Sequence, residues 1–394
     1  MSVALNLIIQ ALSVAFAMFW EILWPLILGF ALSGVVQALV SKKSMVRVLG
    51  DDSPRSIALA SLFGAASSSC SYAAVALARS LFRRGANFTA AIVFQLASTN
   101  LVIELGIIMV VLLGWQFTLA EFVGGPIMIV ILWLVFKATL RPSLVEAARR
   151  QAEQGLLGKM EGHAEMDMSV ADERPFFTRL RSPEGLTAIS HYFVMDWLAV
   201  WKDIAGGLLV AGAVAALVPD DFWKALFLEN HPTLALFWGP LMGPLVAIVS
   251  FVCSVGNVPL AAVLWNGGIS FGGVVAFVFA DLIILPILDI YRRYYGAKVA
   301  LYLLGTLYLT MAAAGLAVEF IFQTMGLVPK ERQAVIVQAS VTWNADTILN
   351  IVFLAVASLL VWRFLRTGGP QMMGMIGPPV SSDRQQVVAN HGTQ

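Results

Sequence analysis

The chain has 394 residues, of which 59% are hydrophobic and 12% are charged, and its mean hydropathy is +0.82. A soluble domain usually carries roughly 25% charged residues. The composition therefore predicts an integral membrane protein and excludes a cytosolic enzyme. With a net charge of +1 and no basic stripe away from the membrane flanks, it also excludes a nucleic-acid-binding protein.

Apolar stretches of about 20 residues are long enough to cross a bilayer as helices. The sequence contains seven such stretches, in chain order at residues 14–40, 88–113, 118–136, 194–218, 271–290, 299–322 and 345–362. Between Lys137 and Glu184 lie 16 of the 49 charged residues. This concentration predicts one soluble loop that divides the membrane part into two halves.

Two further apolar segments are interrupted. Residues 57–82 contain the small, polar run AASSSCS at 65–71, and residues 233–264 contain two Gly-Pro pairs and the run CSVGNVP at 253–259. Small residues and proline break helices, and at membrane depth the freed backbone must be buried in protein or line a cavity. We therefore expect each segment to be a re-entrant helical hairpin that enters and leaves the membrane on one side.

Charge asymmetry predicts the orientation, because Lys and Arg are enriched in cytoplasmic flanks. Basic residues lie on both sides of segment 57–82, whereas acidic residues precede segment 233–264. The first hairpin thus opens to the cytoplasm and the second to the outside, with the N-terminus outside and the C-terminus inside. The expected organisation is a first membrane repeat (1–137), a cytoplasmic linker loop (138–193), a second membrane repeat (194–323), an external loop with the final span (324–366) and a disordered tail (367–394).

The two halves align when the chain is shifted by 183 positions. The pattern Ser67-x-x-Cys70-Ser71 then falls on Ser250-x-x-Cys253-Ser254, so both cysteines of the chain coincide. Together with the opposite charge flanks, this match predicts an inverted-topology repeat, an arrangement in which secondary transporters place their site near the bilayer midplane. The predicted fold class is thus an all-α membrane protein with two inverted repeats, about seven full spans and two re-entrant hairpins.

Two stretches of the chain resemble a known family. They are SSSCSYAA (67–74) with ASTNLVIELG (97–106), and CSVGNVPL (253–260) with ADLIILPILDIYR (280–292). These stretches are similar to the two signatures of the bacterial predicted permeases, a family that includes the organoarsenical efflux permeases. The resemblance implies a multi-pass permease of the bacterial inner membrane. It also implies that Cys70 and Cys253 occupy the positions of the cysteines in the re-entrant motifs of those exporters.

If the two hairpin tips meet, their polar side chains face one midplane cavity. A half-helix that starts at each tip directs the positive end of its dipole at the cavity, which favours an anion or a thiolate. The candidate substrate-binding residues are Ser67, Cys70, Ser71, Tyr72, Asn100, Cys253, Ser254 and Asn257. The alternative for the cysteines is that they are small, buried residues in tight hairpin packing. We predict no metal site and no cofactor.

Two acids lie midway along predicted spans. Glu104 lies in 88–113, with Asn100 one helical turn before it on the same face, and Asp281 lies in 271–290. A carboxylate at that depth is costly, so such residues usually face a cavity and often carry protons or cations. We assign Glu104 and Asp281 to proton or ion coupling. The alternative is a neutral acid in a helix–helix hydrogen bond.

These features favour a secondary permease that moves a small solute or ion, and not an enzyme. Two other classes remain open. One is a transmembrane thiol–disulfide electron carrier that uses one cysteine per repeat. The other is a non-transporting scaffold of a larger membrane complex. The expected partners are the lipid bilayer and a small solute or ion, with no nucleic acid, and the chain can form a homo-oligomer.

Overall fold

The computed structural model describes residues 3–39, 48–68, 71–153, 168, 170, 175–217, 222, 225–228, 231–250, 254–332, 334 and 345–375. These residues form helices and no strands, which confirms the all-α class. The helices are α1 Val3–Leu39, α3 Pro54–Ser67, α4 Ser71–Arg83, α5 Phe88–Asn100, α6 Ile103–Leu112, α7 Trp115–Thr139, α8 Pro142–Glu153, α10 Phe176–Arg181, α11 Pro183–Leu217, α13 Pro232–Ser250, α14 Ser254–Asn266, α15 Phe271–Phe279, the 3-10 turn η1 Ala280–Leu282, α16 Leu285–Tyr295, α17 Ala297–Thr324, α18 Ala345–Arg366 and α19 Gly369–Met375.

Within this part of the chain, five helical segments are long and apolar enough to cross a membrane. They are Phe88–Leu112, Trp115–Thr139, Thr233–Ser250, Ala297–Thr324 and Thr347–Arg366. The pair Phe271–Leu282 and Leu285–Tyr295, bent by 40°, is a sixth span if it counts as one. The protein is thus a multi-pass membrane protein.

Segment Thr233–Ser250 alone is long enough to span, although the sequence predicts it as one arm of a re-entrant hairpin. Hairpin geometry at both interrupted segments therefore stays a prediction.

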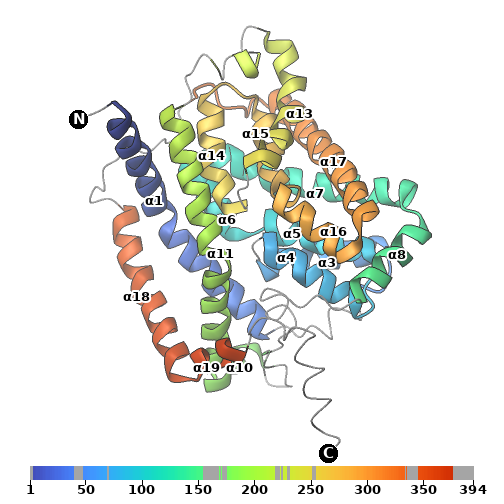
Figure 1. Ribbon diagram of the computed structural model, residues 1–394, viewed down its shortest axis with the longest axis vertical. Helices are drawn as coiled ribbons and strands as arrows, with labels where there is room; N and C mark the ends of the chain where they lie inside the picture. Colours follow the sequence, from blue (N-terminus) through green and yellow to red (C-terminus); the bar gives the residue numbers. More distant parts are fainter. Residues whose placement is uncertain are drawn as a thin grey trace, which may run out of the picture.

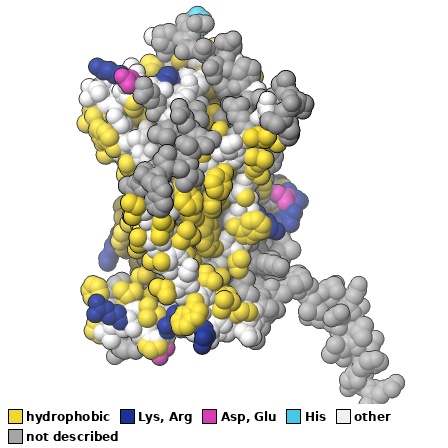
Figure 2. Space-filling view, turned by 90° about the vertical axis from the view of Figure 1, so that its left-hand side faces the viewer, with side chains coloured by type: hydrophobic (Ala, Val, Ile, Leu, Met, Phe, Trp, Pro, Cys, Tyr) yellow, Lys and Arg dark blue, Asp and Glu magenta, His cyan; other side chains and the backbone are white. Residues whose placement is uncertain are grey.

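Apolar side chains cover much of the outer surface, as a bilayer requires. On the face shown in Figure 2, hydrophobic side chains fill the middle, and charged side chains lie at the ends and the margin. Exposed large apolar residues lie on several helices, among them Phe16 on α1, Leu309 on α17 and Leu359 on α18. Helices α1, α11 and α18 stand side by side at one side of the molecule and pack against one another (Figure 1).

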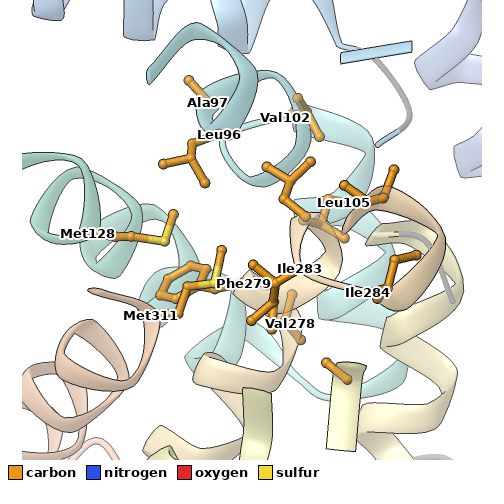
Figure 3. Close-up of a cluster of buried hydrophobic side chains, with 14 of the residues drawn as sticks. Leu96, Ala97, Val102, Leu105, Met128, Val278, Phe279, Ile283, Ile284 and Met311 are labelled. Atoms are coloured by element: carbon orange, nitrogen blue, oxygen red, sulfur yellow. The ribbon is translucent and has the colours of Figure 1, made fainter. Parts of the chain in front are cut away.

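Two of the membrane helices are broken. Helix α5 ends at Asn100, and α6 begins at Ile103 after Leu101 and the extended Val102. In the second half, α15 passes through η1 and stops before α16. Hydrophobic side chains from both broken helices pack in one buried cluster with Met128 of α7 and Met311 of α17 (Figure 3). The core therefore lies where the two breaks come together.

The turns after α4 and α14 share the same local chemistry. Gly85 and Gly268 have φ values of +109° and +106°, which glycine adopts without steric cost. The next helices are capped two residues later, α5 by the Asn87 side chain and α15 by the Ser270 side chain. Each residue of the second set lies 183 positions after its counterpart in the first.

An arginine side chain donates hydrogen bonds to backbone carbonyls of each of these turns. Arg149 donates to the carbonyls of Phe82 (2.9 Å) and Ala86 (3.4 Å), and its guanidinium lies 4.2 Å from the centre of the Phe82 ring. Arg332 donates to the carbonyls of Trp265 and Ile269, both at 2.9 Å, and lies 4.5 Å from the centre of a Trp265 ring. Each residue of this second set lies 183 positions after its counterpart in the first. Two of the three pairs differ in residue type, so the sequence alone does not show that the contacts are equivalent.

Candidate functional site

The first predicted tip lies between α3 and α4. The Ser67 hydroxyl donates to the Gly64 carbonyl at 2.8 Å, and Ser68 takes a left-handed conformation with φ of +37° that ends the helix. Helix α4 starts at Ser71. Cys70 lies outside the described residues, and Tyr72 is described only as part of the α4 backbone.

The second predicted tip lies between α13 and α14. The Ser250 hydroxyl donates to the Ala247 carbonyl at 2.9 Å, as Ser67 does at the end of α3. Asn257 lies in the first turn of α14 and is fully buried. Cys253 lies outside the described residues, and Ser254 is described only as the first residue of α14.

One contact joins the first tip to the second half of the chain. The Ser71 hydroxyl donates a hydrogen bond of 2.7 Å to Oδ2 of Asp281, and both side chains are fully buried. Asp281 lies in η1, at the end of α15 and next to the break before α16. Two of the predicted site residues, 210 positions apart in the sequence, are thus brought together.

The predicted shared face of Asn100 and Glu104 is wrong, because the helix breaks between them. Asn100 is the last residue of α5 and donates to the Leu96 carbonyl at 3.2 Å. Glu104 lies in the first turn of α6, where the positive end of the helix dipole favours its carboxylate. A Cβ atom added to Gly29 of α1 would lie 2.4 Å from the Glu104 Cβ, so this buried acid packs directly against α1.

Glu121 on α7 is a buried acid that the sequence analysis missed. Its side chain is fully buried, and neither carboxylate oxygen has a hydrogen-bond partner in the described part of the chain. The available signal is its position inside the apolar stretch 118–136, where it is the single charged residue. An ionisable residue within a span is itself a functional candidate.

Several buried polar atoms near the helix breaks have no hydrogen-bond partner among the described residues. Besides both oxygens of Glu121, these are the side-chain carbonyl oxygens of Gln95 and Asn100 and both amide atoms of Asn257. The Gln95 amide donates to the Tyr291 hydroxyl, a second polar contact between the two halves. Native proteins leave few buried polar groups unsatisfied. The oxygen atoms of this set can therefore accept hydrogen bonds from a polar solute or water, and the Asn257 amide nitrogen can donate to one.

A separate pocket of about 310 Å³ lies at the start of α15, between α13, α17 and the chain around Lys330. Its lining includes Glu319, which is 2% exposed and accepts a hydrogen bond from the Gly272 amide. At the equivalent position of the first half, 183 residues earlier, Phe136 stacks on Phe88. The pocket thus occurs where the second half carries an acid in place of an aromatic ring.

No group of three or more His, Cys, Asp or Glu side chains suited to a metal ion occurs among the residues with described placement. Both cysteines lie outside that set. What the described geometry offers is a set of buried carboxyl, hydroxyl and amide groups from both halves, of which Ser71 and Asp281 are in direct contact. Such groups can hold a small polar solute or a proton.

Comparisons with known proteins identify the family of this chain. The predicted permease family matches residues 7–320. The protein Rv2963 of Mycobacterium tuberculosis (strain ATCC 25618 / H37Rv), whose name describes it as a permease, is 60% identical over 339 residues, which cover 86% of this chain and 84% of that protein. No solved structure matches the chain. With a family match over most of its length, this chain belongs to the predicted permease family.

Proposed function

We propose that this membrane permease moves a small solute through a site near the bilayer midplane, between the two hairpin tips. The observation that carries the proposal is the hydrogen bond from Ser71 to Asp281. It links the tip of one half to the broken helix of the other. A solute that replaced this bond would interact with both halves at once, which a transport site requires.

The halves 1–137 and 194–323 are proposed to be inverted repeats. The recurrence of turns, caps and arginine contacts at a spacing of 183 residues supports this. In Figure 1, α3 and α4 lie in the lower part of the molecule and α13 and α14 in the upper part, as opposite entry of the two segments requires. The basic flanks support an orientation with the N-terminus outside and the C-terminus in the cytoplasm.

The substrate-binding set retains the eight residues of the sequence analysis. Ser71 and Asn257 have the strongest support, because Ser71 bonds to Asp281 and the Asn257 amide is buried without a described partner. Ser67, Asn100 and Ser254 lie at the same tips and break. Cys70, Tyr72 and Cys253 stay in the set on their sequence positions alone.

Asp281 and Glu104 are proposed as coupling residues. Both are buried acids next to helix breaks, where movement of one helix half changes the surroundings of the carboxyl group. Proton binding at such a group stabilises one arrangement of the breaks over the other. The thiol–disulfide carrier alternative has no supporting observation in the described contacts or in the related protein.

The test is transport by the purified full chain in proteoliposomes. A panel of small solutes, including a trivalent organoarsenical, is first screened by solid-supported membrane electrophysiology. For each transported solute, Ser71→Ala, Asn257→Ala and Asp281→Asn are expected to lower the flux at least about tenfold, as the loss of site hydrogen bonds to a polar solute does.

The matched control is Asp289→Asn. Asp289 is partly exposed and forms ion pairs with Arg292 (2.7 Å) and Arg293 (2.5 Å) on its own helix. This variant should transport at the rate of the unchanged chain. Unchanged flux in all three site variants, with correctly folded protein, would reject the site.

A further inference from the structure

Glu121 is a buried acid to which the proposed transport site assigns no role. Its carboxyl group is fully buried on α7, and no described residue donates a hydrogen bond to either oxygen. An ionised carboxylate in such surroundings is strongly unfavourable, and the group instead takes up a proton. The geometry therefore requires Glu121 to be neutral in this conformation.

The neighbours of α7 place this group at the helix breaks. A Cβ atom added to Gly124 would lie 2.9 Å from the Phe279 ring, and one added to Gly125 would lie 2.4 Å from the Leu101 side chain. Glu121 lies one turn before these glycines, on the same face of the helix. Leu101 lies in the first break, and Phe279 is two residues before Asp281. Helix α7 thus holds its acid against both broken helices.

Asp281 follows two residues after Phe279, whose ring packs against α7 at Gly124, so a charge on Asp281 acts on Glu121. The helices α5 and α15, which pack against α7, carry no titratable side chain. Helices α6 and α17 also pack against α7, and η1 continues α15. Their titratable side chains are Glu104 on α6, Asp281 on η1, and Lys298, Tyr302, Tyr308 and Glu319 on α17. A negative charge on Asp281 makes a second charge on Glu121 still less favourable, so the two groups hold one proton between them.

We propose that Glu121 and Asp281 form a proton-binding carboxyl pair. In the conformation described, Asp281 is ionised and accepts the Ser71 hydrogen bond, and Glu121 carries the proton. When the tip that bears Ser71 moves away, Asp281 loses this donor and binds a second proton from the water that reaches the site, while Glu121 keeps its own proton. The number of protons bound then changes with the conformation of the tip. The role of the pair in transport rests on the proposed permease function, whereas proton binding by the pair can be measured without any solute.

The test is chemical modification by dicyclohexylcarbodiimide, which reacts with protonated carboxyl groups in apolar surroundings. The purified full chain in lipid nanodiscs is treated across a range of pH, without solute, and the modified residue is identified by mass spectrometry. The expected result is modification at Glu121 that decreases as the pH rises. In Asp281→Asn the neighbouring charge is gone, so modification should decline at lower pH than in the unchanged chain.

Two controls separate this pair from other carboxyl groups. Glu146→Gln removes an exposed acid of α8 and should leave the modification of Glu121 unchanged, and Asp289→Asn should leave its pH dependence unchanged. Absence of modification at Glu121 at low pH in folded protein would overturn the proposal, as would the same pH profile in Asp281→Asn and the unchanged chain. A protein that is modified as expected but transports no solute would instead refute only the proposed transport function.

Discussion

Ser71, the first residue of α4, donates a hydrogen bond of 2.7 Å to Asp281, which lies in η1 at the end of α15. One partner begins the helix after the predicted first tip, and the other lies at a helix break in the opposite half of the chain. Because both are fully buried, the bond has no competition from bulk water. Movement of the tip and a change at the break are therefore linked through these two side chains.

Replacing Ser71 by alanine is expected to destabilise the protein by about 1–3 kcal/mol, because it leaves a buried carboxylate with one donor fewer. Thermal unfolding of the purified chain measures the loss. The control is Ser358→Ala, whose exposed hydroxyl donates only to the Leu354 carbonyl of its own helix, and which should change stability by less than about 0.5 kcal/mol. Equal stability of the two variants would show that the Ser71 bond does not hold the tip.

Close packing of α3 against α5 leads to a second prediction. A Cβ atom at Gly64 of α3 would lie 2.3 Å from the Phe94 carbonyl oxygen and 2.9 Å from the Ala97 Cβ. Gly64→Ala should therefore push α3 away from α5 and cost about 1–3 kcal/mol in unfolding free energy.

Gly305→Ala is the matched control for this substitution. Position 305 lies within α17, and nothing lies within 4 Å of an added Cβ atom. Alanine is the better helix former, so this variant should be as stable as the unchanged chain or up to about 1 kcal/mol more stable. A loss of stability at position 305 as large as that at position 64 would contradict the close approach of α3 and α5.

Apolar length and charge allowed most of the membrane helices to be predicted, because those properties are local. The stretch 118–136, for example, lies within α7, and 299–322 lies within α17. The break after Asn100 was not predicted, since Leu101 and Val102 are as apolar as their neighbours and only tertiary packing decides their conformation. The partnership of Ser71 and Asp281 likewise depends on how two distant segments cross. Glu121 could have been predicted as a candidate, because it is a charged residue within an apolar stretch, but the high apolar content around it obscured it.

The two turn-binding arginines should contribute separately to stability. Arg149→Ala removes the side-chain donor to the carbonyls of Phe82 and Ala86, and Arg332→Ala removes the donor to those of Trp265 and Ile269. Each change should cost about 1–3 kcal/mol. Because the two arginines share no partner, the double variant should show the sum within about 0.5 kcal/mol.

Thermal unfolding of the two single variants and the double variant tests this additivity. Arg149→Lys is a useful further variant, because lysine keeps the charge but lacks the planar group that reaches two carbonyls. It should recover only part of the stability lost in Arg149→Ala. Full recovery by lysine would show that charge, and not the paired hydrogen bonds, stabilises the turn.

Glu319 should stabilise the start of α15 through its acceptor oxygen. Glu319→Gln retains a side-chain oxygen that can accept from the Gly272 amide, whereas Glu319→Ala does not. Alanine should therefore cost about 1–3 kcal/mol and glutamine clearly less. Amide hydrogen exchange at residues 271–274 measures the stability of the first turn of α15, and we expect faster exchange in the alanine variant. Identical exchange in both variants would contradict a capping role for this acid.

The proposed inversion of the two halves predicts opposite accessibility at equivalent turns. Arg150 and Glu331 are both exposed and lie next to the turn-binding arginines Arg149 and Arg332. A membrane-impermeant maleimide should label Glu331→Cys in intact bacteria, because that turn is expected outside. It should label Arg150→Cys only after the cells are permeabilised, and the unchanged chain reports the background from its own two cysteines. Labelling of both variants from the same side would refute the inverted topology, because two turns built from the same contacts face opposite compartments only if the halves are inverted.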